Sequence, residues 1–314
     1  MHTAREISTA LAAIRSQPWA ILPEYLAAIE AIAARAGDAN VLKRLAADGH
    51  AERLADARQA VAATGYPLEG TKLSTFSRGT AVVPILGPIF PRATLISSST
   101  GGAPLDAIMD DFKVAAAARE VNRIVLLVDS PGGVVSGLGD AAATIRSTAK
   151  RTTAFVTGMA ASAAYWLASQ AKEVVLDPAA SVGAIGVVAT LSKQVRPDLD
   201  GYTHRQVVSR HAPRKRLDPA KAEDRAVMQH ELDALEAVFL ADVARGRGTT
   251  VANVRAKFGK GGMVGPQQAI RIGMADRVGT LAAIMEPSVA RPGRLASGRF
   301  NAMREVLARR ARLH

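Results

Sequence analysis

Residues 124–133 read Ile-Val-Leu-Leu-Val-Asp-Ser-Pro-Gly-Gly, an apolar run that leads directly into a glycine-rich turn. The five apolar residues at its start predict a strand that is buried on both faces. The two glycines after it allow backbone N–H groups to approach a ligand closely. This stretch therefore predicts a parallel sheet with a binding loop at the carboxyl end of one strand.

Similar short apolar runs occur on both sides of this strand, at residues 81–86, 154–156 and 174–176. Between them, apolar residues recur at helical spacing, as in Leu105, Ile108 and Phe112. Buried strands that alternate with helices pair in parallel through right-handed crossovers. The predicted fold class is α/β, with a parallel sheet and crossover helices.

The pattern divides the chain into four segments. Residues 1–65 are expected to form a helical N-terminal extension, because apolar residues recur at helical spacing after Pro18 and Pro23. Residues 66–78 are rich in Pro, Gly and Ser and are expected to be a linker. Residues 79–285 then form the main domain, and residues 286–314 a basic C-terminal tail.

Composition excludes several classes of protein. The chain has 314 residues and no cysteine, which rules out disulfide scaffolds, thiolate metal sites and cysteine nucleophiles. Residues 1–15 lack the apolar core of a signal peptide. The longest uncharged stretch, residues 152–171, carries six polar side chains, so a buried strand and helix are expected there rather than a membrane span. We expect a cytoplasmic protein.

The loop at residues 129–133 is the first candidate for chemistry. Backbone N–H groups at the end of a strand and the start of a helix suit a phosphate or an oxyanion. Neither of the common glycine-rich phosphate motifs is present. A turn that serves only chain reversal is an equally consistent interpretation of this loop alone.

Ser162 is the second candidate, at another junction between a strand and a helix. A serine among small residues at the start of a buried helix can direct its hydroxyl into a cleft, or can be chosen only for its size. Both loops follow sheet strands, and ligands of open α/β folds bind at the carboxyl ends of the strands. Oxyanion donors and a hydroxyl group could therefore meet there.

A serine nucleophile needs a base. No histidine lies between Ser162 and Tyr202, and Lys215 sits in the basic loop 211–216. Neighbouring positive charge from Arg214 and Arg216 favours the neutral, basic form of a lysine. Taken alone, this loop would instead be a solvated basic surface.

In this order, the motifs resemble the serine/lysine peptidases of the signal peptide peptidase A (SppA) type. They are residues 129–133, Met159–Ser162, residues 181–187 and a lysine about fifty residues after the serine. The resemblance covers about residues 81–281. Residues 18–23, Pro-Trp-Ala-Ile-Leu-Pro, are similar to the phage and prophage branch, which acts in capsid maturation.

The resemblance implies a ClpP/crotonase-like fold and a Ser/Lys dyad, with Ser162 as nucleophile and Lys215 as general base. The backbone N–H groups of Gly133 and Ala163 would form the oxyanion hole. No metal or other cofactor is implied. The substrate would be a protein or peptide with small or apolar side chains before the scissile bond, and the chain would assemble into a homo-oligomeric ring.

Two residues depart from the family pattern. Ala163 and Ala164 follow the serine where glycines are frequent, which predicts a tighter pocket. Ala184 occupies the position of the serine that orients the lysine in the family, so another group must orient Lys215. Lys193 lies closer to Ser162 in sequence and remains a second candidate base.

Other functions remain open. The substrate could belong to capsid maturation or to signal-peptide and protein degradation. Related folds also act on acyl-CoA, and a non-catalytic capsid-assembly protein could share the sequence features. The net charge of +12 is concentrated in the tail and around Lys215, so contact of the tail with a scaffold protein, a portal protein or nucleic acid stays possible.

Overall fold

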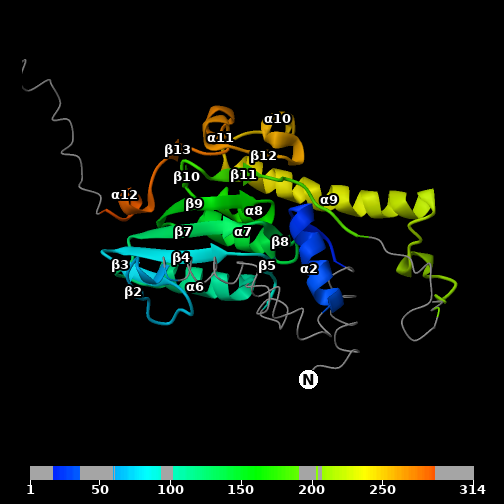
Figure 1. The fold of residues 1–314 in the computed structure, drawn as a ribbon, viewed down its shortest axis with the longest axis horizontal. Helices are drawn as coiled ribbons and strands as arrows, with labels where there is room; N and C mark the ends of the chain where they lie inside the picture. Colours follow the sequence, from blue (N-terminus) through cyan, green and yellow to red (C-terminus); the bar gives the residue numbers. More distant parts are fainter. Residues whose placement is uncertain are drawn as a thin grey trace, which may run out of the picture.

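The computed structural model describes residues 17–35, 59, 61–92, 102–190, 203 and 207–286. Figure 1 shows a central stack of strands with helices packed against it, and one long helix that projects from the stack. The strands are β1 (Trp19–Ile21), β2 (Tyr66–Pro67), β3 (Thr75–Ser77), β4 (Thr80–Leu86), β5 (Ile89–Phe90), β6 (Ala103–Pro104), β7 (Arg123–Ser130), β8 (Gly132–Val134), β9 (Arg151–Ala161), β10 (Glu173–Leu176), β11 (Ser181–Gly183), β12 (Met263–Val264) and β13 (Arg277–Val278). The helices are α2 (Pro23–Arg35), α6 (Leu105–Ala117), α7 (Leu138–Ser147), α8 (Ala163–Ala168), η1 (Pro213–Lys215), α9 (Ala222–Gly246), α10 (Val251–Lys257), η2 (Gly259–Gly261), α11 (Pro266–Ile272) and α12 (Leu281–Met285).

The larger sheet has a parallel centre. β4, β7 and β9 pair in parallel, and both β10 and β11 pair in parallel with β9. Antiparallel strands extend it on both sides, with β12 beside β11, β3 beside β4 and β2 beside β3. The connections between β4, β7 and β9 run through α6 and α7, as expected from the sequence. The predicted α/β fold with a parallel sheet and crossover helices is confirmed.

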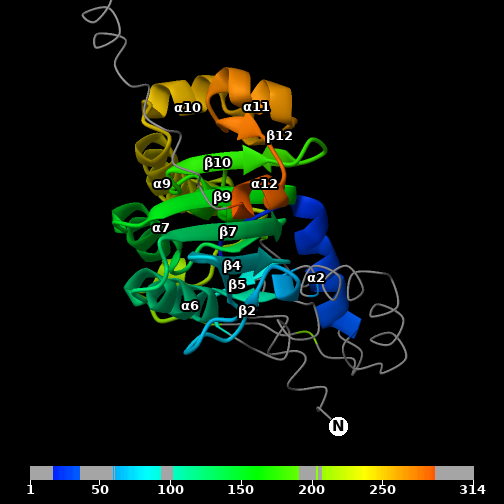
Figure 2. The ribbon, with the colours of Figure 1, turned by 90° about the vertical axis from the view of Figure 1, so that its left-hand side faces the viewer.

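Both faces of the sheet are buried, because neighbouring side chains of a strand point to opposite sides. In β7, Ile124, Leu126 and Val128 belong to the main core, which also contains residues of α6, α7 and α8. Val125 and Leu127 belong to a second cluster on the other face, together with Ile284 of α12. In Figure 2, α12 lies in front of the strands and α6 and α7 lie to the left. This double burial explains the continuous apolar runs in the sequence.

A smaller sheet adjoins the larger one and contains the glycine-rich loop. Its strand order is β1-β8-β5-β6, and β8 consists of residues 132–134. A methyl group on Gly133 would lie 2.0 Å from the carbonyl oxygen of Ile89, so only glycine allows β5 to approach β8 this closely. The loop is therefore part of a sheet rather than a free turn.

The N-terminal extension differs from the prediction at its start. Trp19–Ile21 is a strand, paired with β8, and the helix begins only at Pro23. Three apolar residues are too few to show a period, so the sequence could not separate a short strand from a helical turn. Residues 36–58 of the expected extension lie outside the described residues.

Residues 66–78, expected to be a linker, are instead built into the larger sheet as β2 and β3. The buried carboxylate of Asp111 holds the loop between these strands. It accepts hydrogen bonds from the backbone N–H groups of Lys72 (2.7 Å), Leu73 (2.9 Å) and Ser74 (2.9 Å). These contacts to α6 explain why a segment rich in turn residues is ordered against the domain.

The long helix α9 begins at Ala222, three residues after Pro219. Asp218 forms a turn before it, accepting the N–H of Ala220 with its side chain, and Lys221 is the N-cap residue. Only the C-terminal end of α9 is buried, through Phe239, Leu240 and nearby residues. Of the helices in the described part of the chain, none combines the length and apolar character that a membrane span requires.

Candidate active site

Ser162 occupies the sharp junction between β9 and α8. Its backbone has φ 53° and ψ −115°, a conformation that non-glycine residues rarely adopt and that costs about 1–3 kcal/mol. The backbone N–H of Ser162 donates to Gly183 O at 2.7 Å, and its carbonyl accepts from Trp166 N at 2.9 Å. These two bonds hold the strained turn, a geometry typical of serine nucleophiles that are presented at a strand end.

The hydroxyl group of Ser162 lies inside the protein. Its side chain donates a long hydrogen bond of 3.4 Å to Gly186 O, and the residue is only 1% exposed. The two carbonyl partners of Ser162 come from the end of β11 (Gly183) and from the loop that follows it (Gly186). The structure thus brings Ser162 together with residues 181–187, the third motif of the family resemblance.

The glycine-rich loop is the third part of the site. Gly132 has φ 103° and its N–H donates to Ser130 Oγ at 3.2 Å. A methyl group on Gly132 would lie 3.0 Å from the carbonyl oxygen of Ala161, the residue before Ser162. The loop that carries Gly133 therefore lies directly beside the serine, and Ala163 follows the serine as the first residue of α8.

Ala184 also has a strained backbone, with φ 52°. Its N–H donates to Gly262 O at 3.0 Å, which ties the loop to η2 and β12. The methyl side chain of Ala184 offers no hydrogen bond to a lysine, as the sequence indicated. The loop is fixed by backbone contacts instead.

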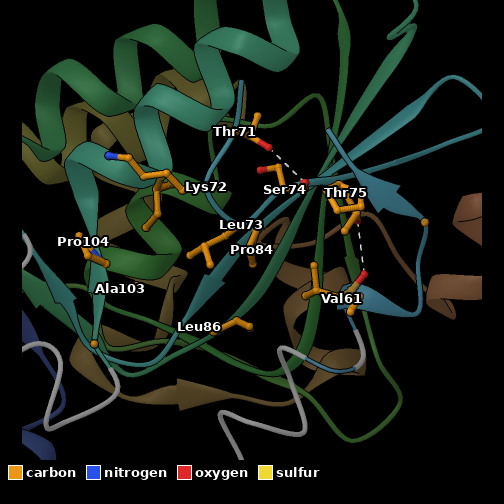
Figure 3. A pocket seen from close by; sticks show the side chains of 15 residues that line it. Val61, Thr71, Lys72, Leu73, Ser74, Thr75, Pro84, Leu86, Ala103 and Pro104 are labelled. Carbon is orange, nitrogen blue, oxygen red and sulfur yellow. Dashed lines mark hydrogen bonds between the residues drawn. The ribbon is translucent and has the colours of Figure 1, made fainter. Parts of the chain in front are cut away.

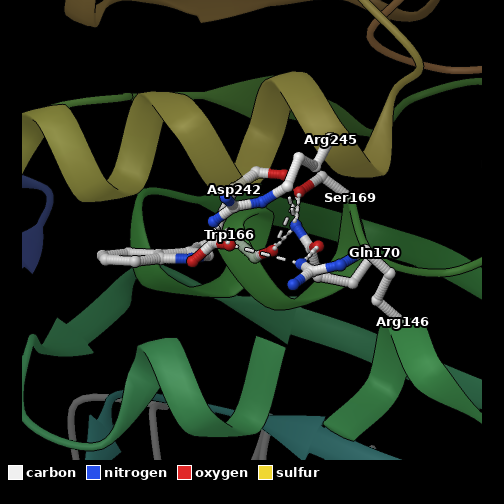
Figure 4. Close-up of polar contacts among 6 residues, drawn as sticks. All are labelled: Arg146, Trp166, Ser169, Gln170, Asp242 and Arg245. Carbon is white, nitrogen blue, oxygen red and sulfur yellow. Dashed lines mark hydrogen bonds and ion pairs between the residues drawn. The ribbon is translucent and has the colours of Figure 1, made fainter. Parts of the chain in front are cut away.

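A buried carboxylate anchors α8 behind the serine (Figure 4). Asp242 of α9 is 2% exposed and accepts hydrogen bonds from Trp166 Nε1 at 2.9 Å, Arg245 at 2.6 Å and Arg146 at 3.2 Å. The indole ring of Trp166 stacks on Phe239 with 4.4 Å between ring centroids. Helices α7, α8 and α9 are therefore joined at one buried point, one helical turn from Ser162.

A second ion pair joins Arg247, at the C-terminal end of α9, to Asp276, which precedes β13. Arg247 donates to both carboxylate oxygens of Asp276, at 2.8 and 3.1 Å. Burial raises the pKa of the Asp276 carboxyl, but the hydrogen bonds from Arg247 and Val174 N–H outweigh it and the pKa falls below its usual value. Nearby, burial raises the pKa of Tyr165, whose hydroxyl donates to Met274 O. Tyr165 therefore serves as a neutral hydrogen-bond donor.

Lys215 does not lie beside Ser162. It is an exposed residue of η1, whereas the serine hydroxyl is buried. Figure 1 shows α9 projecting beyond the sheet, with the chain that precedes it at the outer end. A Ser/Lys contact is thus absent among the described residues, and the alternative base, Lys193, lies outside them.

Sequence reasoning missed one neighbour of the site, the strand β1. It pairs with residues 132–134 and so lies against the glycine-rich loop. The only local signal was the pair of prolines, Pro18 and Pro23, that bracket four apolar residues. Prolines at both ends exclude a continuous helix but do not identify a sheet partner.

A cavity of ≈ 280 Å³ lies between β3, β4 and α6 (Figure 3). Its lining is mainly apolar, including Val61, Leu86 and Ile108, and includes neither Ser162 nor Gly133. Within the described ranges, no group of three or more His, Cys, Asp or Glu residues is placed to hold a metal ion.

Comparison with known proteins supports this arrangement. Residues 144–288 match the model of peptidase family S49, and residues 94–193 match that of the Clp proteases. The chain is also 28% identical over 236 residues to "Capsid assembly protease C" of Escherichia phage lambda. That alignment covers 71% of this chain and 52% of the relative, so the chain spans about half the length of the curated relative it matches.

The matched ranges include all the residues proposed for the site. The Clp protease match contains the glycine-rich loop and Ser162, and the S49 match contains Ser162 and Lys215. The predicted resemblance is therefore confirmed: this chain is similar to the S49 peptidases and has a ClpP-like fold.

Proposed function

We propose that this protein is a serine endopeptidase with Ser162 as its nucleophile. The observation that carries the proposal is the strained turn at Ser162, with φ 53°, beside the glycines of β8. A backbone conformation of this kind is strained and persists only because the surrounding contacts hold it. Such strained residues are concentrated at functional sites. The matches to two peptidase families support the same reaction class.

In the proposed reaction, Ser162 Oγ attacks the peptide carbonyl carbon and its proton passes to a neutral lysine. The tetrahedral oxyanion accepts hydrogen bonds from the backbone N–H groups of Gly133 and Ala163. The C–N bond then breaks, the amine leaves with the proton, and water hydrolyses the acyl-enzyme with the lysine again acting as base. The buried position of the site strengthens each of these electrostatic contacts.

The proposed base is Lys215, which lies between Arg214 and Arg216 at the end of η1. Because Lys215 lies at the outer end of α9, we propose that it reaches Ser162 of a neighbouring copy in a homo-oligomeric ring. The projecting part of α9 supports an assembly of this kind. It carries half-buried Met228, Leu232 and Leu235 on one face and Val238, which is 48% exposed.

We propose that the substrates are capsid-assembly proteins, such as a scaffold or portal protein, in the cytoplasm or in a procapsid. The name of the phage lambda relative supports this substrate class. The basic residues of the tail at 286–314 could bind an acidic partner.

A serine-reactive fluorophosphonate tests the reaction class. We expect the phosphonate to label Ser162, identified by mass spectrometry, and Ser162→Ala to lose both labelling and at least a thousandfold of casein cleavage. Lys215→Ala should lose cleavage as well, whereas Lys221→Ala, a change of an exposed lysine in the same region, should keep it. Absence of labelling both in the wild-type oligomer and in the folded Ala20→Glu variant described below would reject the proposal. An acyl-CoA enzyme would instead bind CoA without acylation, and an assembly protein would keep its function with Ser162→Ala.

A further inference from the structure

The short strand β1 is hydrogen-bonded along both of its edges. On one side it pairs antiparallel with β8, with Ala20 opposite Gly133. On the other side Trp19 and Val188 exchange two hydrogen bonds, of 2.8 and 2.7 Å. Residues 19–21 thus fill the space between the glycine-rich loop and the chain that follows β11.

The register of the β1–β8 pair places the backbone of β1 against the loop that carries the proposed oxyanion donor, Gly133. Leu22 N–H donates to Pro131 O at 3.0 Å, and Val135 N–H donates to Pro18 O at 3.3 Å. In an antiparallel ladder the hydrogen-bonded pairs recur at every second residue. Ala20 and Gly133 lie midway between these two pairs, so the N–H of Gly133 faces Ala20.

The same strand lies beside the nucleophile. A methyl group on Gly132 would lie 2.2 Å from Ala20 O and 3.0 Å from Ala161 O. Strand β1 and the end of β9 therefore both pack closely against the α-carbon of Gly132. Ser162 follows Ala161 and is only 1% exposed. A peptide cannot reach a hydroxyl that is buried to this extent unless a neighbouring segment moves.

The side chains of β1 alternate between two surroundings. Ala20 is fully buried in the main core, which also contains Ala160, Ala163 and Ala164 around the serine. Trp19 and Ile21 pack on the other side with Leu26 and Ile29 of α2, in a separate apolar cluster. The rings of Trp19 and Phe90 also pack in a T-shaped arrangement, with 5.9 Å between centroids and an interplanar angle of 90°. A small residue therefore points toward the site, while larger ones anchor the strand.

We propose that β1 occupies the position of a substrate main chain and holds the peptidase closed until it leaves. The proposal rests on the serine peptidase function proposed above. An extended peptide that adds to a sheet edge uses the edge's backbone N–H and C=O groups. The backbone groups at the edge of β8 and at Val188 can hydrogen-bond to only one strand at a time, so β1 and a substrate compete for them. The substrate that replaces β1 is an extended segment with a small residue at the position of Ala20.

A reversible crosslink tests whether β1 must leave. The chain has no cysteine, so a full-length Trp19→Cys/Val188→Cys variant contains only the two introduced thiols. Residues that exchange both hydrogen bonds have Cα atoms about 5.5 Å apart, which suits a disulfide. Formation of the bond is verified by intact mass, and casein cleavage and phosphonate labelling are then measured before and after reduction.

We expect the oxidised variant to cleave and label at least tenfold more slowly than its reduced form, with full recovery on reduction. Wild-type protein treated with the same oxidant should not change. Equal rates in the oxidised and reduced forms would overturn the proposal for β1 while leaving the peptidase function intact. Failure of the wild-type protein and of the folded Ala20→Glu release variant described next to label at all would instead reject the peptidase function.

A release variant tests the same inference from the opposite direction. Ala20→Glu places a charge where the side chain is fully buried, which disfavours the bound strand. We expect phosphonate labelling of Ser162 to become several-fold faster. The matched control is Ala27→Glu, the same change at an exposed position of α2, which should label at the wild-type rate. A folded Ala20→Glu variant that labels no faster than Ala27→Glu would also overturn the proposal.

Discussion

The indole N–H of Trp166 donates a 2.9 Å hydrogen bond to Oδ2 of Asp242, a carboxylate that is 2% exposed. Trp166 also donates its backbone N–H to Ser162 O, so this pair joins the proposed nucleophile to α9 through a single residue. The turn at Ser162 and helix α9, which begins after the basic loop, are therefore linked through Trp166 and the buried carboxylate of Asp242.

Asp242→Ala should therefore lower the free energy of unfolding by about 3 kcal/mol, since it leaves the Trp166 N–H and the Arg146 guanidinium without their shared acceptor. Asp233→Ala, an exposed change on the same helix, should stay within about 0.5 kcal/mol of the wild type. Both values come from urea unfolding followed by circular dichroism. Similar stability of the two variants would mean that the buried carboxylate does not anchor α8.

Mixing two inactive variants tests where the base comes from. If Lys215 serves the serine of a neighbouring copy, oligomers formed from Ser162→Ala and Lys215→Ala chains should regain up to about a quarter of the wild-type cleavage rate, because random assembly pairs an intact serine with an intact lysine at that frequency. The measurement is casein cleavage after joint refolding, with each variant alone as control. No recovery in mixed oligomers would show that the lysine and the serine belong to one chain.

The glycines of the site and of α7 should respond in opposite ways to the same change. Gly133→Ala places a methyl group 2.0 Å from Ile89 O, so β5 and β8 must separate, and both stability and phosphonate labelling should fall. Gly139→Ala meets no atom within 4 Å and lies in a helix, so stability should rise by about 0.5–1 kcal/mol with labelling kept. Thermal unfolding and labelling rates check both. A stable, active Gly133→Ala variant would contradict the close packing of β8.

The pair of Arg247 and Asp276 predicts a loss of stability in acid. The pKa of Asp276 is lower in the folded chain than its usual value, so between the two values the unfolded chain binds more protons. The stabilisation is present above pH about 4 and disappears as the pH falls through the folded pKa. The difference in unfolding free energy between wild type and Asp276→Asn should accordingly shrink from pH 6 to pH 3. Asp233→Asn is the control, and a pH-independent difference for Asp276→Asn would contradict the role of its charge.

The sequence determined the central parallel strands β4, β7, β9 and β10, the crossover helices and the two loops that meet at Ser162. Ile124 and Leu126 lie in one apolar cluster and Val125 in the other, so both faces of this strand are buried. Burial on both faces requires apolar residues at successive positions, which the sequence shows as an unbroken run. Parallel strands then bring their carboxyl ends to one edge, so the glycines of β8 and the serine after β9 meet without further information. These features follow from local pattern and from topology.

Only the tertiary structure decided the positions of β1, Asp242 and Lys215. Trp19 pairs with Val188, and Trp166 bonds to a carboxylate 76 residues away, so no local pattern marks either contact. The resemblance in motif order implied that Lys215 lies near Ser162. In a single chain, however, Lys215 is exposed before the outer end of α9 and does not contact Ser162. The physical reason is the same in each case. The partner that a strand, a buried charge or a lysine side chain meets depends on how distant segments pack. The sequence specifies that packing only through the whole fold.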